Sequence, residues 1–149
     1  MDSIQLYIDS DKILRLEFQE AIHPTSVHLK ADHWSFVYKL YRDRVLFDFG
    51  LFNSNYFVCE ERKVLIIEEY NLSILDKENI KVDEDVIKNL RLFDFRTNRT
   101  GRFSKLTGSS FLLQKIINDT FVFSKQYSDR TSEFEIDLAS IPLFDFGRI

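Results

Sequence analysis

The sequence contains little of what disulfide-rich, membrane-spanning or helical proteins depend on. Its 149 residues include one cysteine, two prolines, four glycines and three alanines. The single cysteine, Cys59, excludes an intrachain disulfide and a zinc site built from several thiolates, so we expect a reducing compartment. No apolar run exceeds four residues, which excludes a membrane-spanning helix. The opening residues MDSIQLYIDSDK lack the basic head and the apolar stretch of a signal peptide, so we expect a cytoplasmic protein.

Basic residues are also fewer than acidic residues. The chain has 20 Lys and Arg against 24 Asp and Glu, a net charge of −4. Nucleic-acid binders need a surplus of cations for phosphate, so this balance argues against general nucleic-acid binding and permits a basic protein partner. No phosphate-binding or dinucleotide-binding glycine pattern occurs, so no cofactor is expected. The length fits a single domain spanning residues 1–149.

Aromatic residues are abundant, and many follow a period of two. There are 15 Phe and 6 Tyr, and in ILRLEF the residues Leu14, Leu16 and Phe18 alternate with Arg15 and Glu17. Alternation of this kind is typical of a half-buried strand. Aromatic side chains favour a pleated surface, and a sequence with few alanines lacks the best helix former.

Four pairs of such segments flank short polar turns and predict β-hairpins. The turns lie at residues 10–12, 42–44, 62–63 and 128–132. Parallel strands would need long crossovers, so consecutive hairpins favour antiparallel pairing. We therefore expect a mainly β fold, with α+β as the alternative. Its single antiparallel sheet would be strongly bent or barrel-like and would carry one or two short helices.

Two segments carry helical signals. Residues 83–90, DEDVIKNL, begin with acids, which favour a helix N-terminus. A serine at 109 or 110 is a suitable N-cap for FLLQKIIND, in which apolar residues recur at a spacing of four. The second segment also fits a strand with Phe111, Leu113 and Ile117 facing inward. The sequence leaves residues 109–118 open between helix and strand.

The tetrapeptide LFDF occurs three times, at residues 46–49, 92–95 and 143–146. Composition alone predicts about 0.016 copies. In a strand the two Phe of each copy share one face, so we expect all six to be buried. The flanking sequences differ, which argues against a threefold repeat such as a β-trefoil. A hard-cation site formed by the three aspartates of the copies is the alternative.

An acidic surface is the first candidate for function. Adjacent residues on a strand point to opposite faces, so neither pair of neighbouring glutamates makes a catalytic dyad. Electrostatic docking of a basic partner is the better interpretation. The predicted partner-binding residues are Glu60, Glu61, Glu68, Glu69, Asp83, Glu84 and Asp85.

A basic loop over residues 96–110 is the second candidate. Its cations recur every three residues around Gly101, and guanidinium groups match the oxygens of phosphate. The alternative anion-binding residues are Arg96, Arg99, Arg102 and Lys105.

The usual catalytic and metal-binding residues are poorly placed. His23, His28 and His33 are five residues apart, unlike the i, i+4 pair that holds zinc on a helix. Cys59 precedes Glu60, whose charge disfavours a thiolate. We therefore expect no catalytic residue and no metal site.

These features together predict a non-enzymatic protein-binding module. A small acidic domain without a cofactor motif is suited to a bacterial immunity or antitoxin protein that occludes a basic toxin domain. One alternative is a small-ligand-binding β-barrel whose aromatic residues line a cavity. A further alternative is a metal-independent RNA-processing enzyme that uses the basic loop and a histidine.

Overall fold

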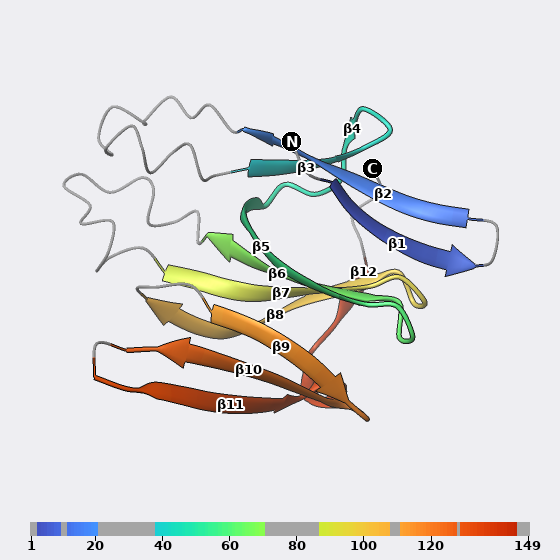
Figure 1. The fold of residues 1–149 in the computed structure, drawn as a ribbon. Coiled ribbons are helices and arrows are strands. Elements are labelled where there is room, and N and C mark those ends of the chain that lie inside the picture. The colour runs from blue at the N-terminus through green and yellow to red at the C-terminus, as the bar shows by residue number, and fades with distance from the viewer. Residues whose placement is uncertain are drawn as a thin grey trace.

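The structure is a computed structural model that describes residues 3–9, 12–20, 38–70, 87–107, 111–127 and 129–145. Most of these residues lie in antiparallel strands (Figure 1). The strands are β1 (Ser3–Asp9), β2 (Lys12–Glu20), β3 (Tyr38–Arg42), β4 (Val45–Leu46), β5 (Leu51–Cys59), β6 (Val64–Tyr70), β7 (Ile87–Asp94), β8 (Arg99–Thr107), β9 (Phe111–Ile117), β10 (Thr120–Gln126), β11 (Thr131–Asp137) and β12 (Phe144–Asp145). Within this part of the chain the single helical element is a short 3-10 turn, η2 (Leu138–Ser140). The prediction of a mainly β, antiparallel fold is confirmed.

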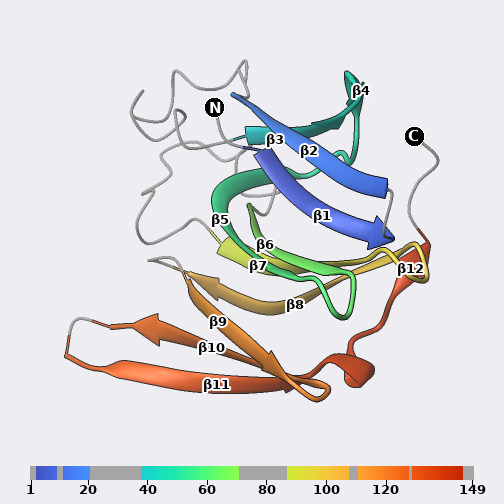
Figure 2. The same cartoon turned by 45° about the vertical axis from the view of Figure 1, so that its right-hand side comes forward.

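The strands form two sheets rather than one. The larger has the order β1-β2-β3-β5-β6-β7-β8-β12, with β4 paired to β3, and the smaller has the order β11-β10-β9. The larger sheet bends strongly, so that β1 to β3 lie over β5 to β7, and it does not close into a barrel (Figures 1 and 2). The smaller sheet lies on the other side of β5 to β8. The result is three layers with β6 and β7 in the middle.

All four predicted hairpins are present: β1 with β2, β3 with β4, β5 with β6 and β10 with β11. The turn between β3 and β4 contains only Asp43 and Arg44, whose φ angles are 50° and 67°. Two successive positive φ angles define the turn type whose twist matches the strands of a hairpin. Residues 34–37 of the predicted second hairpin lie outside the described residues.

The helix prediction at residues 83–90 is wrong for the residues that the structure describes, and the choice left open at residues 109–118 is decided in favour of a strand. Residues 87–90 belong to β7, which pairs with β6 and β8 on its two sides, and residues 83–86 lie outside the described part. Residues 111–117 form β9, as the strand alternative predicted. A bulge opposite Val122 and Phe123 reverses the inward face, so Ile116 packs in the core while Ile117 is 51% exposed. Pairing within the sheets overrides the weak local helix signals.

The basic loop also has a different form from the prediction. Residues 99–107 are strand β8, and the connection from β7 is a tight turn over residues 95–98. Asn98 adopts a φ of 54°, which asparagine tolerates better than most residues. Arg96 therefore lies in the turn, whereas Arg99, Arg102 and Lys105 are spread along the strand.

Strand β6 separates two hydrophobic cores. Val64 and Ile66 pack into the core under the smaller sheet, while Leu65 and Ile67 pack into the core under β1 to β3. All four side chains are at most 4% exposed. A strand covered on both faces is apolar at every position, which explains the run VLII.

The aromatic side chains fill these cores. The most deeply buried rings are Phe52, Phe93, Phe111, Phe121 and Phe123, all at most 2% exposed. Their centroids lie at contact distances, such as 5.6 Å between Phe111 and Phe123. Among the described residues the aromatic interior is therefore a packed core, and the sheet around it is open, in contrast to the ligand-lined barrel considered as an alternative.

The prediction that all six LFDF phenylalanines are buried is wrong. Phe93 and Phe95 of the middle copy and Phe47 of the first copy are buried. Phe49 is 83% exposed and Phe144 is 69% exposed. The first copy leaves β4 after Leu46, so strand alternation ends there, and the third copy lies on a two-residue edge strand. Phe146 lies outside the described residues.

We predict that Phe93→Ala lowers the free energy of unfolding by about 3 to 5 kcal/mol, because it leaves a cavity in the core. Phe49→Ala is the matched control from the same tetrapeptide and should change stability by less than about 0.5 kcal/mol, since its ring is exposed. Urea unfolding followed by fluorescence measures both. Equal effects of the two substitutions would contradict the burial pattern.

Candidate functional site

The three LFDF copies meet in space. Thr100 of β8 pairs with Phe93 of the second copy on one side and with Phe144 of the third copy on the other. The first copy joins them because the Phe47 ring lies 5.1 Å from the Phe93 ring. Segments that are far apart in the sequence thus surround one end of β7 and β8.

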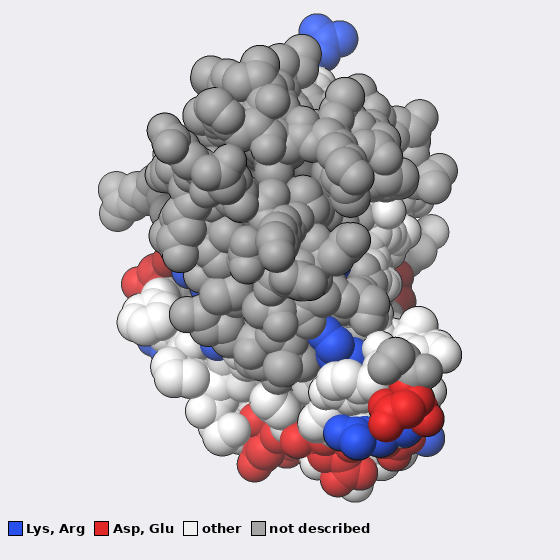
Figure 3. Space-filling model, turned by 90° about the vertical axis from the view of Figure 1, so that its left-hand side faces the viewer, with Lys and Arg blue, Asp and Glu red and all other residues white. Residues whose placement is uncertain are grey.

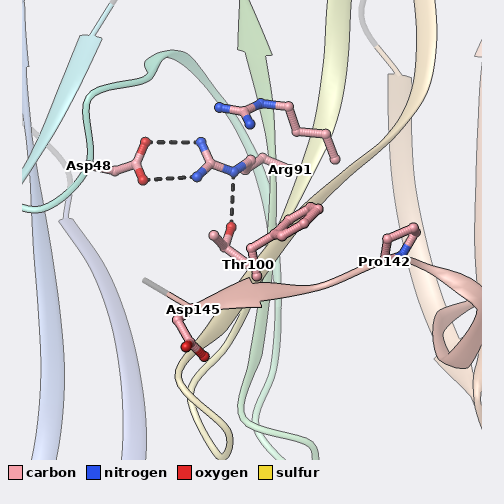
Figure 4. Close-up of a pocket in the computed structure, with 8 residues that line it drawn as sticks. Asp48, Arg91, Thr100, Pro142 and Asp145 are labelled. Carbon is pink, nitrogen blue, oxygen red and sulfur yellow. Dashed lines mark hydrogen bonds and ion pairs between the residues drawn. The ribbon is translucent and has the colours of Figure 1, made fainter. Parts of the chain in front are cut away.

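A buried ion cluster lies at this meeting point and is centred on Arg91. Its guanidinium donates two hydrogen bonds of 2.9 Å to the two carboxylate oxygens of Asp48 (Figure 4). It also donates to Glu69 at 2.5 Å and to the Thr100 hydroxyl at 2.9 Å. Thr100 in turn donates to the carbonyl of Leu92. The Arg91 side chain is only 5% exposed, so these partners replace most of its hydration.

Arg102 extends the cluster to the surface. Its Nε and Nη2 donate to the two oxygens of Glu69 at 2.5 and 3.2 Å. The hydrogen bond to Glu69 raises the pKa of Arg102, which outweighs the opposing effect of burial. Unlike Arg91, the Arg102 side chain is 56% exposed. Glu69 therefore connects one buried guanidinium to one that solvent reaches.

Two glycines let the chain approach this cluster. A Cβ at Gly50 would lie 2.4 Å from a carboxylate oxygen of Glu69 and 2.7 Å from the ring of Phe52. A Cβ at Gly101 would lie 2.5 Å from the carbonyl oxygen of Pro142. The first glycine admits the loop that carries Asp48, and the second admits the segment that leads to β12.

A surface pocket of about 520 Å³ opens over the cluster. Its lining comes from the loop after β4, from β7 and β8, and from the segment around β12. The lining residues are Asp48, Arg91, Thr100, Gly101, Arg102, Pro142, Phe144 and Asp145.

The three LFDF aspartates do not gather into a cation site. Both oxygens of Asp48 bind Arg91, and Asp94 accepts a hydrogen bond from the backbone N–H of Arg96 at 2.9 Å. Asp145 lies 3.6 Å from Arg99. In the part of the chain that the structure describes, no three acidic, histidine or cysteine side chains are placed to hold a metal ion.

The predicted acidic surface is largely dispersed. Glu60 and Glu61 are exposed at the β5–β6 turn, where Glu60 accepts a hydrogen bond from the backbone N–H of Tyr7 at 3.0 Å. Glu68 and Glu69 are 0% and 3% exposed, so they cannot belong to a docking surface, and this part of the prediction is corrected. Residues 83–85 lie outside the described residues.

Glu68 forms a second buried polar cluster on the opposite face of β6. It accepts hydrogen bonds from the side-chain amides of Asn53 and Asn55 at 2.7 and 2.6 Å. It also accepts from the backbone N–H of Phe111 at 2.6 Å, and Lys88 lies 3.6 Å away. Glu68 thereby attaches the start of β9 to the larger sheet, which is a structural role.

The four predicted anion-binding residues are not brought together. Arg102 lines the pocket, whereas Arg96 and Arg99 form exposed ion pairs at the β7–β8 turn. Nothing is described of the Lys105 side chain. Arg91 was not among the predicted site residues, although an arginine flanked by Leu90 and Leu92 in a strand is a signal for a buried ion pair.

An acidic stripe on β11 was also missed. Glu133, Glu135 and Asp137 are exposed at alternate positions, while Phe134 and Ile136 pack inward. The alternation in EFEID was the available signal. Acidic side chains gather along the lower edge of the molecule in Figure 3, the level at which Figure 1 places β11.

The comparisons with known proteins identify no relative. A scan against protein-family models finds no matching family, and searches of curated proteins and of solved structures find no similar protein. Within the described residues, no helix has the length and apolar character needed to cross a membrane. The three histidines lie outside the described residues, and Cys59 is a partly buried free thiol.

We predict that Glu69→Gln destabilises the fold by roughly 3 to 5 kcal/mol, because it leaves the buried Arg91 with one carboxylate in place of two. Glu61→Gln is the matched control at an exposed position and should have an effect below about 0.5 kcal/mol. Chemical unfolding of both variants tests this. A stability of Glu69→Gln within 1 kcal/mol of the parent, about the size of a surface ion pair, would show that the cluster contributes little.

We predict that Gly50→Ala costs about 1 to 3 kcal/mol, because the added methyl overpacks the space beside Glu69 and Phe52. The thermal unfolding midpoint should fall accordingly. The double variant Gly50→Ala/Phe52→Leu separates the two clashes, since it relieves only the contact with the ring. An undiminished midpoint in Gly50→Ala would contradict the close approach.

Proposed function

We propose that the chain is a non-enzymatic protein-binding module that neutralises a basic partner domain by occluding it, the role of a bacterial immunity or antitoxin protein. The exposed acidic stripe of β11 carries this proposal. A cytoplasmic location is part of it, and the free thiol of Cys59 suits a reducing compartment.

Strand β11 combines two features that favour a partner. It is an edge strand, since it pairs with β10 alone among the strands that the structure describes. The backbone groups on its outer side are therefore available to an added strand. Glu133, Glu135 and Asp137 stand on one face of this strand, where Lys or Arg at alternate positions of the added strand would lie directly opposite.

The ion cluster supports a binding role over an enzymatic one. Proton transfer requires a group that can exchange its proton with a substrate. The carboxylates of Asp48 and Glu69 are instead occupied by the guanidinium groups of Arg91 and Arg102. Such an arrangement fixes the positions of the strands and favours a rigid scaffold.

The test is to capture the partner from cells that express the protein natively and to measure its association rate as a function of salt. We expect the double variant Glu133→Lys/Glu135→Lys to slow association at least about tenfold at low salt, because steering by the acidic stripe is lost. The difference should shrink at high salt, since the Debye length falls to about 3 Å at 1 M.

Glu17→Lys/Asp43→Lys is the matched control, because it changes the net charge equally at exposed positions of β2 and the β3–β4 turn, which lie in the layer opposite the smaller sheet (Figure 1). It should leave the association rate close to that of the parent protein. If the two double variants slow association equally, only the net charge matters and β11 is not the docking strand. Failure to recover a basic protein partner would contradict the proposed function itself.

A further inference from the structure

The guanidinium of Arg102 has unused hydrogen-bond donors. Arginine carries five N–H donors, arranged so that two edges of the guanidinium can each engage a pair of oxygens. Glu69 occupies one edge, formed by Nε and one N–H of Nη2. The other edge, formed by Nη1 and the second N–H of Nη2, meets no acceptor among the residues that the structure describes.

Arg91 shows the contrast within the same cluster. Its Nη1–Nη2 edge is occupied by the two oxygens of Asp48, and its Nε–H by Thr100. Arg91 is therefore a structural group, whereas Arg102 lines the pocket with a free edge and a side chain that is 56% exposed. The two hydrogen bonds to Glu69 fix the orientation of the Arg102 guanidinium. A ligand would therefore not have to order this side chain on binding.

We propose that the pocket over the ion cluster binds a small molecule that carries a carboxylate or a phosphate. The free edge of Arg102 binds the anionic group, and Phe144 and Pro142 contact the apolar body of the molecule. This site is independent of the proposed docking of a protein partner on β11.

The groups around Arg102 favour an anion over a cation, because Arg102 has free donors and Asp48, the aspartate of the cluster, has both oxygens occupied. Asp48 accepts from Arg91 with both oxygens and from the backbone N–H of Gly50. Asp145 is paired across from Arg99 on β8, and in Figure 4 its carboxylate points away from the Asp48–Arg91 pair. Of the two aspartates that line the pocket, Asp48 is therefore occupied, and Asp145, whose side chain is 88% exposed, is directed away from the Asp48–Arg91 pair.

The size and the apolar wall of the pocket fit a ligand with an aromatic body. A volume of about 520 Å³ lies within the range of about 300 to 1,000 Å³ that small-molecule sites occupy. Phe144 is 69% exposed. A planar body placed against it would cover apolar surface that the fold leaves in water. The raised pKa of Arg102 keeps the guanidinium charged at every physiological pH.

The experiment is calorimetric titration of the whole chain with phenyl phosphate, benzoate, inorganic phosphate and the neutral control benzamide. We expect phenyl phosphate or benzoate to bind and benzamide not to bind. The stronger of the two aromatic anions distinguishes phosphate from carboxylate. Inorganic phosphate should bind more weakly than phenyl phosphate, because it makes no contact with Phe144.

Arg102→Lys tests the anchoring group. It retains a positive charge beside Glu69 and removes the free planar edge, so we expect at least about a tenfold loss of affinity. Arg96→Lys is the matched control, because Arg96 is 58% exposed in the turn before β8 and forms its ion pair with Asp94, which does not line the pocket. It should leave the affinity unchanged.

Two results would overturn the proposal: no binding of either aromatic anion at millimolar concentration, or equal affinity of the parent protein and Arg102→Lys. If circular dichroism shows that Arg102→Lys is unfolded, the same titrations of the variant Phe144→Ala test the proposal instead. In that variant, weaker binding of phenyl phosphate with unchanged binding of inorganic phosphate supports the site, and unchanged binding of both anions overturns it. These measurements involve no protein partner, so their failure is separate from failure of the proposed function.

Discussion

The burial of Arg91 is the constraint on which the arrangement of the larger sheet depends. A guanidinium that is 5% exposed costs several kcal/mol unless carboxylates compensate for its lost hydration. Those carboxylates come from β6 and from the loop after β4, so that loop must cross the face of β7. The crossing is possible because residue 50 is glycine, which leaves space for Glu69. One buried charge thus fixes a loop that is 43 residues away in the sequence.

Adjacent glutamates on β6 extend this principle to both faces of the central layer. Neighbouring residues of a strand point to opposite faces, so Glu69 enters the core under β1 to β3 and Glu68 enters the core under the smaller sheet. Glu69 joins β6 to β7 and β8, whereas Glu68 joins β6 to the first residue of β9. The pair EE at the end of an apolar strand therefore joins β6 to β7 and β8 within the central layer and to the smaller sheet beside it. It contributes to assembly of the fold and is unavailable to a partner.

The sequence predicts the strands and hairpins well because alternation and turn residues are local properties. It does not show which polar face a second layer covers, and for this reason Glu68 and Glu69 were predicted to be exposed. Acidic residues are rarely buried, so exposure is the sound expectation until a partner such as Arg91 is identified. That partner is recognised only through pairing between distant segments. The helix predicted at residues 83–90 failed in its described half for the same reason, since β7 is stabilised by two neighbouring strands.

The three LFDF copies show how position in a sheet decides what a short sequence does. In β7, which has neighbours on both sides, Phe93 is buried as strand alternation requires, and Phe95 in the turn directly after β7 is buried as well. In β12, at the edge of the same sheet, the equivalent Phe144 has its backbone paired on one side only, and its ring is exposed. The first copy is divided, with Phe47 in the core and Phe49 in solvent. The pocket is lined by residues of the first and third copies that are not part of the hydrophobic core, whereas both phenylalanines of the second copy are buried. The same tetrapeptide that packs in the core at β7 therefore supplies Phe144 to the wall of the pocket. It also supplies Asp48, which binds Arg91 in the cluster beneath.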